Sequence, residues 1–349
     1  MGGNAKKVLV TPLDWGLGHA ARCVPLIKEL LQQGSIVFIA SSGSALAFLK
    51  QEFPDLKFFE LQAYQPVYSA NNLLFNLVLQ IPRFTKVIKR EHEQVEQIVQ
   101  QNSIDIIMSD NRYGCWSTRT RNILISHQLT LQVPLFSFLV NFFHERALRK
   151  FSECWIPDVP GNDSLARKLS VNHNLKTRHI GVLSRMEWRP TVIQYELLAI
   201  VSGPEPQRTL FENLIRRELK TSGRHCLIVR GLPQNDVTAT AGNLEEINHL
   251  STTELNQIIL ESELILSRSG YSTIMDMAIL GKKTIFIPTP GQTEQEYLAS
   301  EFMKDNIAFS MRQKLFNLQE ALEQSANYTG FKRIERGNEL KEAIKDLLK

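Results

Sequence analysis

The stretch KKVLVTPLDWGLGHAARCVPLIKELLQQGSIVFIAS, residues 6–41, contains the arrangement that decides the fold. The apolar run at residues 8–10 predicts a strand, and the glycines at 16 and 18 indicate a turn. An amphipathic helix follows until Gly34 ends it, and a second apolar run predicts another strand. A strand, a helix and a second strand in this order predict a β-α-β unit.

Further short apolar runs in the first half alternate with helical segments, and a second set of runs begins at Leu197. The runs are Ile104–Met108, Ile123–Ile125 and Leu135–Phe138 in the first half, and Cys226–Val229, Leu264–Leu266 and Thr284–Ile287 in the second. Such alternation predicts a parallel sheet with helices on both faces. We therefore predict an α/β fold of two Rossmann-like domains.

The length of 349 residues also favours two domains, because single cores rarely grow beyond ~250 residues. A turn-rich stretch after Trp155 marks the boundary, which gives an N-terminal domain at 1–187 and a C-terminal domain at 188–349. The last helix, at about 331–349, could pack back on the N-terminal domain. Open parallel sheets bind ligands beyond the carboxyl ends of their strands, so we expect a cleft lined by the strand-to-helix turns of both domains.

Composition restricts the class of protein. The four cysteines are far apart in the sequence and form no CxxC pair, so neither a zinc site nor a disulfide framework is predicted. The start MGGNAKK lacks the pattern of a signal peptide, and the longest apolar stretch, Ile123–Phe143, is interrupted by polar residues. We therefore expect a cytoplasmic protein. The formal charge of +4 and the absence of RRM, KH and zinc-finger signatures argue against a nucleic-acid partner.

The turn DWGLGH, residues 14–19, opens the first helix. Gly16 and Gly18 let the backbone approach a ligand, but without a third glycine they would by themselves indicate only a tight turn. His19 changes this interpretation, because a histidine at such a turn titrates near neutral pH and can take a proton from an attacking hydroxyl. We expect His19 to be a general base; a surface histidine without catalytic role is the alternative.

Two further residues follow strands of the first half. Asp110 comes directly after the predicted strand 104–109, where a carboxylate could orient His19 and stabilise its charged form. A helix-capping Asp is the commoner explanation, and the spacing leaves both open. For His127, burial in the core is the first expectation and a place at the ligand-binding edge is the second.

The stretch SRSGYSTIMDMA, residues 267–278, begins where another predicted strand ends. Backbone N–H groups from Gly270 onward open a helix whose positive end can hold a diphosphate, and Arg268 adds a cation. Asp276 could accept hydrogen bonds from a ribose, while Glu294 and Gln295 could bind sugar hydroxyls. Singly, these acids would be solvated or first-turn helix residues; together they indicate a nucleotide-sugar site. The residues expected in this site are Arg268, Ser269, Gly270, Tyr271, Ser272, Thr273, Asp276, Glu294 and Gln295.

These motifs resemble the donor-binding signature of GT-B glycosyltransferases, both the plant UDP-glycosyltransferases and the bacterial transferase that adds N-acetylglucosamine to make lipid II. The resemblance implies that Asp276 binds the ribose, that Glu294 and Gln295 contact the donor hexose, and that a loop containing Leu250 and Thr252 holds the base through its backbone. GLGH at 16–19 resembles the N-terminal glycine loop of these enzymes, whose histidine lies on the acceptor side and often acts as a base with an Asp partner.

The sequence also differs from these families. Asp276 replaces the usual Glu, Arg268 stands where plant enzymes have a phosphate-binding His, and the turn at 202–208 replaces the Gly-rich loop of the lipid II enzyme. Gly203 and Arg208 are still expected near the phosphates because their turn follows a strand, although two prolines remove amide donors there.

The resemblance implies an inverting, metal-independent transferase that moves a hexose or N-acetylhexosamine from a UDP-sugar to a hydroxyl acceptor. A helix N-terminus and one Arg can stabilise the departing nucleoside diphosphate, so neither a metal nor a cofactor beyond the donor substrate is expected. The acceptor stays open, with lipid-linked or cell-envelope glycan precursors as candidates. The alternatives are a nucleotide-sugar epimerase or hydrolase of the same fold, and a non-catalytic nucleotide-sugar-binding protein.

Apolar residues flanked by cations occur at 72–90, and again from Phe142 to Arg146. Such patterns can mark a helix that rests on an anionic membrane, as in membrane-associated members of the family. Burial against the N-terminal core is the first expectation for both. A peripheral place on the inner face of the membrane is therefore added to the cytoplasmic prediction as a second possibility.

Overall fold

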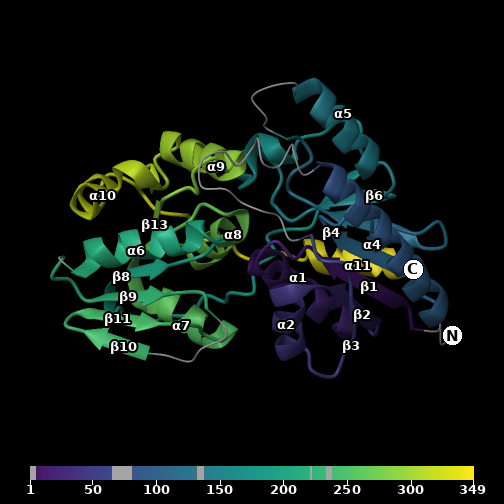
Figure 1. Ribbon diagram of the computed structural model, residues 1–349, viewed down its shortest axis with the longest axis horizontal. Coiled ribbons are helices and arrows are strands. Elements are labelled where there is room, and N and C mark those ends of the chain that lie inside the picture. Colours follow the sequence, from purple (N-terminus) through teal and green to yellow (C-terminus); the bar gives the residue numbers. More distant parts are fainter. Residues whose placement is uncertain (1–4, 65–80, 132–136, 221, 233–237) are drawn as a thin grey trace. The chain divides into compact units, whose positions relative to one another are not determined.

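A computed structural model describes residues 5–64, 81–131, 137–220, 222–232 and 238–349. Contacts between Cα atoms divide these residues into two compact units. Unit 1 contains residues 5–64, 81–184 and 336–349, and unit 2 contains residues 185–335. Each unit is built on a seven-stranded sheet that is flanked by helices (Figure 1).

Unit 1 has a parallel sheet with the strand order β3-β2-β1-β4-β5-β6-β7. Its strands are β1 (Lys7–Pro12), β2 (Ile36–Ser41), β3 (Lys57–Glu60), β4 (Ile106–Asp110), β5 (Arg121–Ile125), β6 (Glu153–Ile156) and β7 (Thr177–His179). Its helices are α1 (Leu17–Gln32), α2 (Gly43–Glu52), α4 (Ile81–Asn102), α5 (Ser137–Leu148) and α11 (Glu339–Leu348). The expected strand at Leu135–Phe138 is wrong in its described part, because Ser137 begins α5.

The order of strands in unit 1 reverses between β1 and β4. From β1 the sheet continues through β2 and β3 on one side and through β4 to β7 on the other. The carboxyl ends of β1 and β4 are therefore neighbours, and the register pairs Pro12 with Asp110. Open α/β sheets bind ligands beyond the strand ends at such a reversal.

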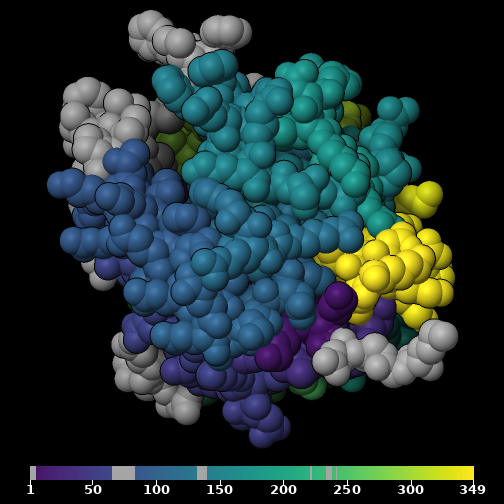
Figure 2. Space-filling model, turned by 90° about the vertical axis from the view of Figure 1, so that its right-hand side faces the viewer, coloured from purple at the N-terminus to yellow at the C-terminus, as the bar shows by residue number. Residues whose placement is uncertain are grey.

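The strands of unit 1 are apolar because the sheet is covered by helices. Leu9 of β1 and Ile107 of β4 share a buried cluster with Val95 and Val99 of α4. Helix α11 contacts α1, and the Gln33 side chain donates a hydrogen bond of 2.9 Å to the Lys341 carbonyl. Figure 2 shows α11, in yellow, on the surface beside N-terminal segments in purple.

Unit 2 has a similar plan, with the strand order β10-β11-β9-β8-β12-β13-β14, in which β10 runs antiparallel to β11 and the other neighbouring strands are parallel. Its strands are β8 (Tyr195–Ile200), β9 (Cys226–Val229), β10 (Thr238–Ala241), β11 (Leu244–Ile247), β12 (Ser262–Ser267), β13 (Lys283–Phe286) and β14 (Phe309–Ser310). Its helices are α6 (Gln207–Lys220), α7 (Thr252–Glu261), α8 (Tyr271–Leu280), α9 (Thr293–Lys304) and α10 (Leu318–Ser325). The strand order reverses between β8 and β12, which places their carboxyl ends side by side.

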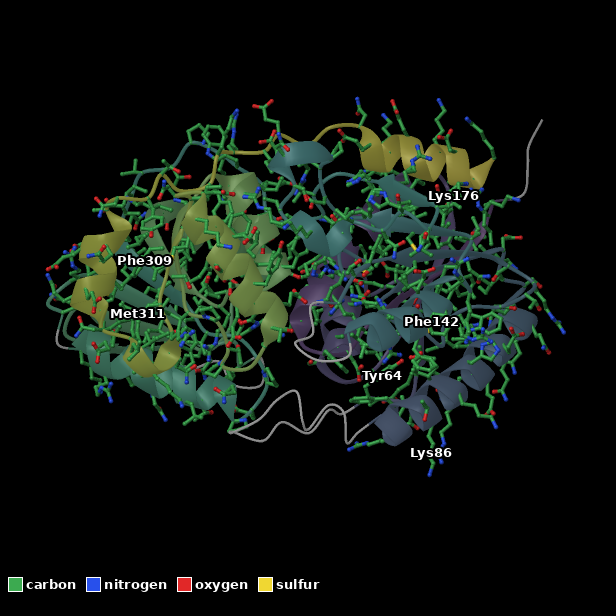
Figure 3. All side chains as sticks on the ribbon, turned by 90° about the horizontal axis from the view of Figure 1, so that it is seen from above. Tyr64, Lys86, Phe142, Lys176, Phe309 and Met311 are labelled. Carbon is green, nitrogen blue, oxygen red and sulfur yellow. The ribbon has the colours of Figure 1, made fainter. Side chains whose placement is uncertain are left out.

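Alternate strand residues of unit 2 face its two helical layers. Leu197 and Leu266 lie in one buried cluster with Phe211 of α6 and with Phe309 of β14, the residue labelled in Figure 3. Phe286 of β13 instead contacts Phe302 of α9, with 6.5 Å between the ring centroids. The structure thus has the two Rossmann-like halves of a GT-B fold, each with a mostly parallel sheet, as predicted.

Candidate functional site

The loop after β1 reaches the strand reversal of unit 1. Gly16 is the N-cap of α1 and has φ of 84°, a value that side chains disfavour, which explains the glycine. The loop is tied down at Asp14, whose Oδ2 accepts hydrogen bonds from the Ser42 hydroxyl (2.9 Å) and from the Tyr64 amide (3.2 Å). The first turn of α1, with Gly18 and His19, therefore starts from a fixed position.

His19 and Asp110 come together at this edge of the sheet. The His19 Nδ1 lies 3.1 Å from Asp110 Oδ1, and the side chains are 19% and 0% exposed. Asp110 is the last residue of β4, where its backbone also holds the loop, since the Leu13 amide donates to the Asp110 carbonyl at 3.0 Å. The pairing that the proposed roles require is present, and the catalytic roles themselves remain predictions.

A third residue, Arg22, completes the cluster. Its Nε donates to Asp110 Oδ2 at 2.6 Å, and its Nη2 donates to Asp110 Oδ1. The same Nη2 lies 2.9 Å from His19 Nδ1, and Nη1 lies 3.2 Å from Nδ1 of His127. His127 is only 4% exposed, so the sequence expectation of burial holds, but the buried ring contacts a polar cluster at the strand edge.

Burial and the neighbouring charges shift the ionisation of this cluster. Burial lowers the pKa of His19 below its ordinary value; Asp110 opposes that shift, while Arg22 adds to it. Burial alone would raise the pKa of Asp110, but the charges of Arg22 and His19 outweigh it and hold the pKa well below its ordinary value. At neutral pH the cluster thus contains an ionised Asp, a charged Arg and a neutral His19.

The sequence contained a signal for Arg22 that we did not use. Helix residues three apart share a face, so Arg22 lies on the same face as His19. It also stands in the apolar stripe of α1, beside Cys23 and Leu26, and all three side chains are buried. A cation at a core position needs a counterion, and the carboxylate of Asp110 at the end of β4 provides it.

A second buried polar cluster supports the same loop. Arg112, with a fully buried side chain, lies within 3.2 Å of both Asp14 Oδ1 and Glu91 Oε1. Glu91 also accepts hydrogen bonds from the Tyr64 hydroxyl (3.0 Å) and the Gly114 amide (2.9 Å). The ends of β1 and β4 are thus fixed by two buried arginines, Arg112 from one cluster and Arg22 from the other.

In unit 2, the start of α8 lies at the strand reversal. Ser267 ends β12, and Gly270 is the N-cap of α8 without a side chain to occupy the first N–H groups. The N–H groups of this first turn, which includes Ser272 and Thr273, point toward the N-terminal end of the helix. An anion can therefore be bound there by the backbone.

Gln295 connects the start of α9 to the start of α8. Its Oε1 accepts a hydrogen bond from the Thr289 amide at 2.9 Å, and its carbonyl accepts one from the Ser269 hydroxyl at 2.8 Å. Its Nε2 lies 3.9 Å from the point that a Cβ on Gly270 would occupy. Of the two polar atoms of the Gln295 side chain, the amide oxygen is therefore already used within the protein, and the expected contact with the sugar would fall to Nε2. Glu294 and Asp276 are half-buried.

Arg268 has a different place from the one expected. Its side chain is 1% exposed, Nη1 donates to the carbonyls of Ile287 and Pro288 at 2.9 and 3.1 Å, and the guanidinium lies 3.8 Å from the Phe211 ring centroid. Burial lowers its pKa to about 9. In this arrangement Arg268 connects β12, β13 and α6, so the expected phosphate clamp is corrected to a structural role.

The turn after β8 needs a similar correction. The Arg208 side chain pairs with Glu205 at 2.6 Å and with buried Glu212 at 2.5 Å, so its charge is already neutralised by carboxylates. Gly203 is exposed and has φ of 108°. Since the Arg208 charge is paired, the backbone amide of Gly203 is the group of this turn that could contact a phosphate. Leu250 and Thr252 are half-buried at the start of α7, where the Thr252 hydroxyl accepts a hydrogen bond from Arg185 at 2.6 Å.

Exposed apolar side chains gather on α5. Val140, Phe142 and Phe143 are 36%, 57% and 67% exposed, and the exposed cations Arg146 and Arg149 follow them. Figure 3 labels Phe142 there and Lys86, another exposed cation, on α4. Of the other stretch that we singled out, residues 72–90, residues 72–80 lie outside the described residues, and residues 81–90 belong to α4, where Val87 is buried with Leu13 and Tyr64. Within the described part of the chain, no helix combines the length and apolarity that crossing a bilayer requires.

Comparisons with known proteins agree with these features. Residues 224–347 match the family described as Glycosyltransferase family 28 C-terminal domain. An uncharacterized glycosyltransferase of Methanosarcina acetivorans is 22% identical over 325 residues, which cover 83% of this chain and 81% of the relative.

Two solved structures share the fold over almost the whole chain. MurG of Acinetobacter baumannii has a TM-score of 0.60 at 14% identity, with 99% of each chain covered. The spinosyn rhamnosyltransferase SpnG, complexed with thymidine diphosphate, has a TM-score of 0.61 at 12% identity, with 98% of this chain and 95% of the other covered. The matched domain and the relatives identify the protein as a glycosyltransferase with a GT-B fold.

Proposed function

We propose that this glycosyltransferase inverts the sugar configuration and moves a hexose or N-acetylhexosamine from a UDP-sugar to a hydroxyl acceptor, with His19 as the base. The observation that carries the proposal is the contact of 3.1 Å between His19 and Asp110 at the strand reversal of unit 1. A base must be unprotonated before it acts, and burial lowers the pKa of His19, which favours that form at neutral pH.

The donor would bind to unit 2 through the backbone. The uncapped first turn of α8 offers N–H groups to a diphosphate, and Asp276 on the same helix would accept hydrogen bonds from the ribose. Glu294 and the Nε2 of Gln295 would contact the sugar. Because Arg268 is turned inward, the first turn of α8 would stabilise the leaving diphosphate without this side chain.

The reaction then needs one proton transfer. His19 Nε2 would accept the proton of the acceptor hydroxyl as its oxygen attacks the anomeric carbon, and the bond from that carbon to the diphosphate oxygen would break. The negative charge leaves with the nucleoside diphosphate, so the charges of the reaction balance without a metal ion. We propose a metal-independent transfer on this ground and no cofactor besides the donor.

The His19→Ala variant tests the proposal. We expect UDP-sugar affinity to be kept, while transfer falls by ~10²-fold or more, the usual contribution of general base catalysis. His92→Ala is the control, because His92 stacks on Trp116 in the same unit, with 4.2 Å between the rings, and does not contact Asp110. Turnover would be measured by product analysis with a panel of UDP- and dTDP-sugars, with and without candidate acceptors and with EDTA.

Several outcomes would contradict the proposal. Undiminished transfer in His19→Ala excludes this residue as the base. Loss of the reaction in EDTA excludes the metal-independent mechanism. Release of free sugar in the absence of any acceptor would indicate a hydrolase, and interconversion of the donor would indicate an epimerase.

We further propose that unit 1 contacts an anionic membrane surface through α5, which would suit a lipid-linked acceptor. Exposed Val140, Phe142 and Phe143 could enter the headgroup region, and Arg146 could contact anionic lipids, whereas Arg149 already pairs with Glu145 at 2.6 Å. The protein would then be cytoplasmic and peripheral on the inner face of the membrane.

A further inference from the structure

We propose that Arg22 is a positioning residue for the transfer reaction: it holds the carboxylate of Asp110, keeps His19 neutral, and fixes the proton of His127 on Nε2. This inference rests on the proposed function, in which His19 is the base. It adds a residue that acts through the base and does not touch the substrate.

The first observation is the geometry of the guanidinium. Arg22 is 2% exposed and contacts Asp110 through two different nitrogens, Nε and Nη2. A guanidinium is planar and rigid, so this paired contact fixes the plane of the carboxylate as well as its position. Since His19 Nδ1 contacts the same carboxylate, Arg22 also determines the orientation of the histidine ring.

The second observation concerns the proton on His127. Arg22 Nη1 lies 3.2 Å from His127 Nδ1, and a guanidinium can only donate hydrogen bonds. His127 Nδ1 must therefore accept, which means that it carries no proton. The proton of the ring is then on Nε2.

The third observation concerns His19, whose Nδ1 has two partners of opposite kinds. Asp110 Oδ1, at 3.1 Å, can only accept a hydrogen bond, and Arg22 Nη2, at 2.9 Å, can only donate one. A charged imidazolium would meet the guanidinium with a like charge at this distance. The neutral ring avoids this repulsion. Its Nδ1 can either donate to Asp110 or accept from Arg22, and only the tautomer that donates to Asp110 leaves Nε2 without a proton, as the proposed base requires.

This arrangement differs from a simple pair of Asp and His. In such a pair the carboxylate favours the charged ring, so the histidine holds its proton more strongly. Here burial lowers the pKa of His19, and the Arg22 charge offsets part of the opposing effect of the carboxylate, so that Asp110 orients the ring without charging it.

Two other ionisable groups of the described residues lie around the cluster. They are Cys23, 3.6 Å from Asp110 Oδ2, and Tyr113, which follows β4, and burial raises the pKa of both.

Two variants separate the charge of Arg22 from its shape. Arg22→Met removes both the charge and the shape, and leaves the Asp110 carboxylate with His19 and Cys23 as its side-chain contacts. The pKa of His19 should rise, because the carboxylate is no longer offset. Arg22→Lys keeps the charge but has one nitrogen, which cannot contact both Asp110 and His127 in the same way. The pKa of His19 should then stay low, while His127 loses its fixed proton position.

The control is Arg112→Met. Arg112 is an equally buried arginine of the same unit with carboxylate partners, and it contacts neither His19 nor Asp110. Its loss should destabilise unit 1 in a similar way and leave the titration of His19 unchanged. If Arg22→Met does not fold, Arg22→Lys still tests the proton position on His127.

The readout is ¹⁵N NMR of the imidazole nitrogens of the ligand-free protein between about pH 5 and 8, together with the pH profile of kcat. We expect the His19 titration and the acid limb of kcat to move together to higher pH in Arg22→Met, with the KM for the donor unchanged. An unshifted titration in Arg22→Met, or a protonated Nδ1 on His127 in the wild type, would overturn the proposal. Undiminished transfer in His19→Ala would instead defeat the proposed base and leave the NMR result valid.

Discussion

Asp110→Asn is the change whose effect on stability follows most directly from the structure. The substitution keeps the shape of the side chain and removes its charge. Arg22 would then be a buried cation that faces two imidazole rings and an amide, with no carboxylate among these contacts. Removing one partner of a buried ion pair costs ~3–5 kcal/mol, because the other charge is left without compensation.

This loss is large compared with the total stability of about 5–15 kcal/mol for a folded domain. With a urea dependence of ~3 kcal/mol per molar, the unfolding midpoint of unit 1 should fall by about 1–2 M. Tryptophan fluorescence can follow the transition, because Trp15, Trp116 and Trp155 all lie in this unit. Asp105→Asn is the matched control: Asp105 precedes the same strand but is exposed, so its loss should cost under ~1 kcal/mol.

The pH dependence gives a second test of the same pair. The pKa of Asp110 is held below its ordinary value, so its contribution to stability is present above the unfolded pKa of ~3.9 and disappears as the pH falls through the folded value. The gap between wild type and Asp110→Asn should therefore be full at pH 5 and above and shrink below about pH 4. A gap under ~1 kcal/mol at neutral pH, or one that persists in acid, would refute the buried ion pair.

Two further predictions concern binding. Asp276→Ala should reduce the rise in melting temperature that UDP produces without magnesium. Gln295→Ala should reduce the rise produced by a UDP-sugar more than the rise produced by UDP. Equal losses for both ligands in Gln295→Ala would exclude a sugar-binding role for Gln295. The double variant of Phe142→Asp and Phe143→Asp should lower cosedimentation with anionic vesicles, while Leu315→Asp, which changes a 69% exposed residue of unit 2, should leave it unchanged. Undiminished sedimentation of the double variant would exclude α5 as the contact.

The sequence was sufficient for the fold and for the position of His19 and Asp110, because both depend on strand ends. An apolar run locates the end of a strand, and the βαβ connections then bring β1 and β4 together. The paired contact of Arg22 with Asp110 could not be derived in this way. It depends on which face of α1 is buried and on the one carboxylate that this face meets.

The two arginines that we expected near the phosphates, Arg268 and Arg208, show the opposite error. Arg268 was expected to face a ligand because it follows a strand, but the packing of Phe211 against its guanidinium turns it inward. That contact joins residues 57 positions apart in the sequence, which no local pattern reveals. For Arg208 a local signal existed, since Glu205 and Glu212 stand three and four residues away, the spacings at which helix side chains meet.

The return of the chain to unit 1 through α11 has a consequence for protein synthesis. Ala343, Ile344 and Leu347 of this helix are buried, and α1 is among its contacts. At ~5–20 residues per second, the ribosome needs roughly 10–30 s to make the segment from Arg185 to the end of α11. During that time the nascent first unit keeps an uncovered apolar surface on the side where α11 will bind. Chaperone capture should therefore be strongest while unit 2 is being translated, and should end when α11 emerges.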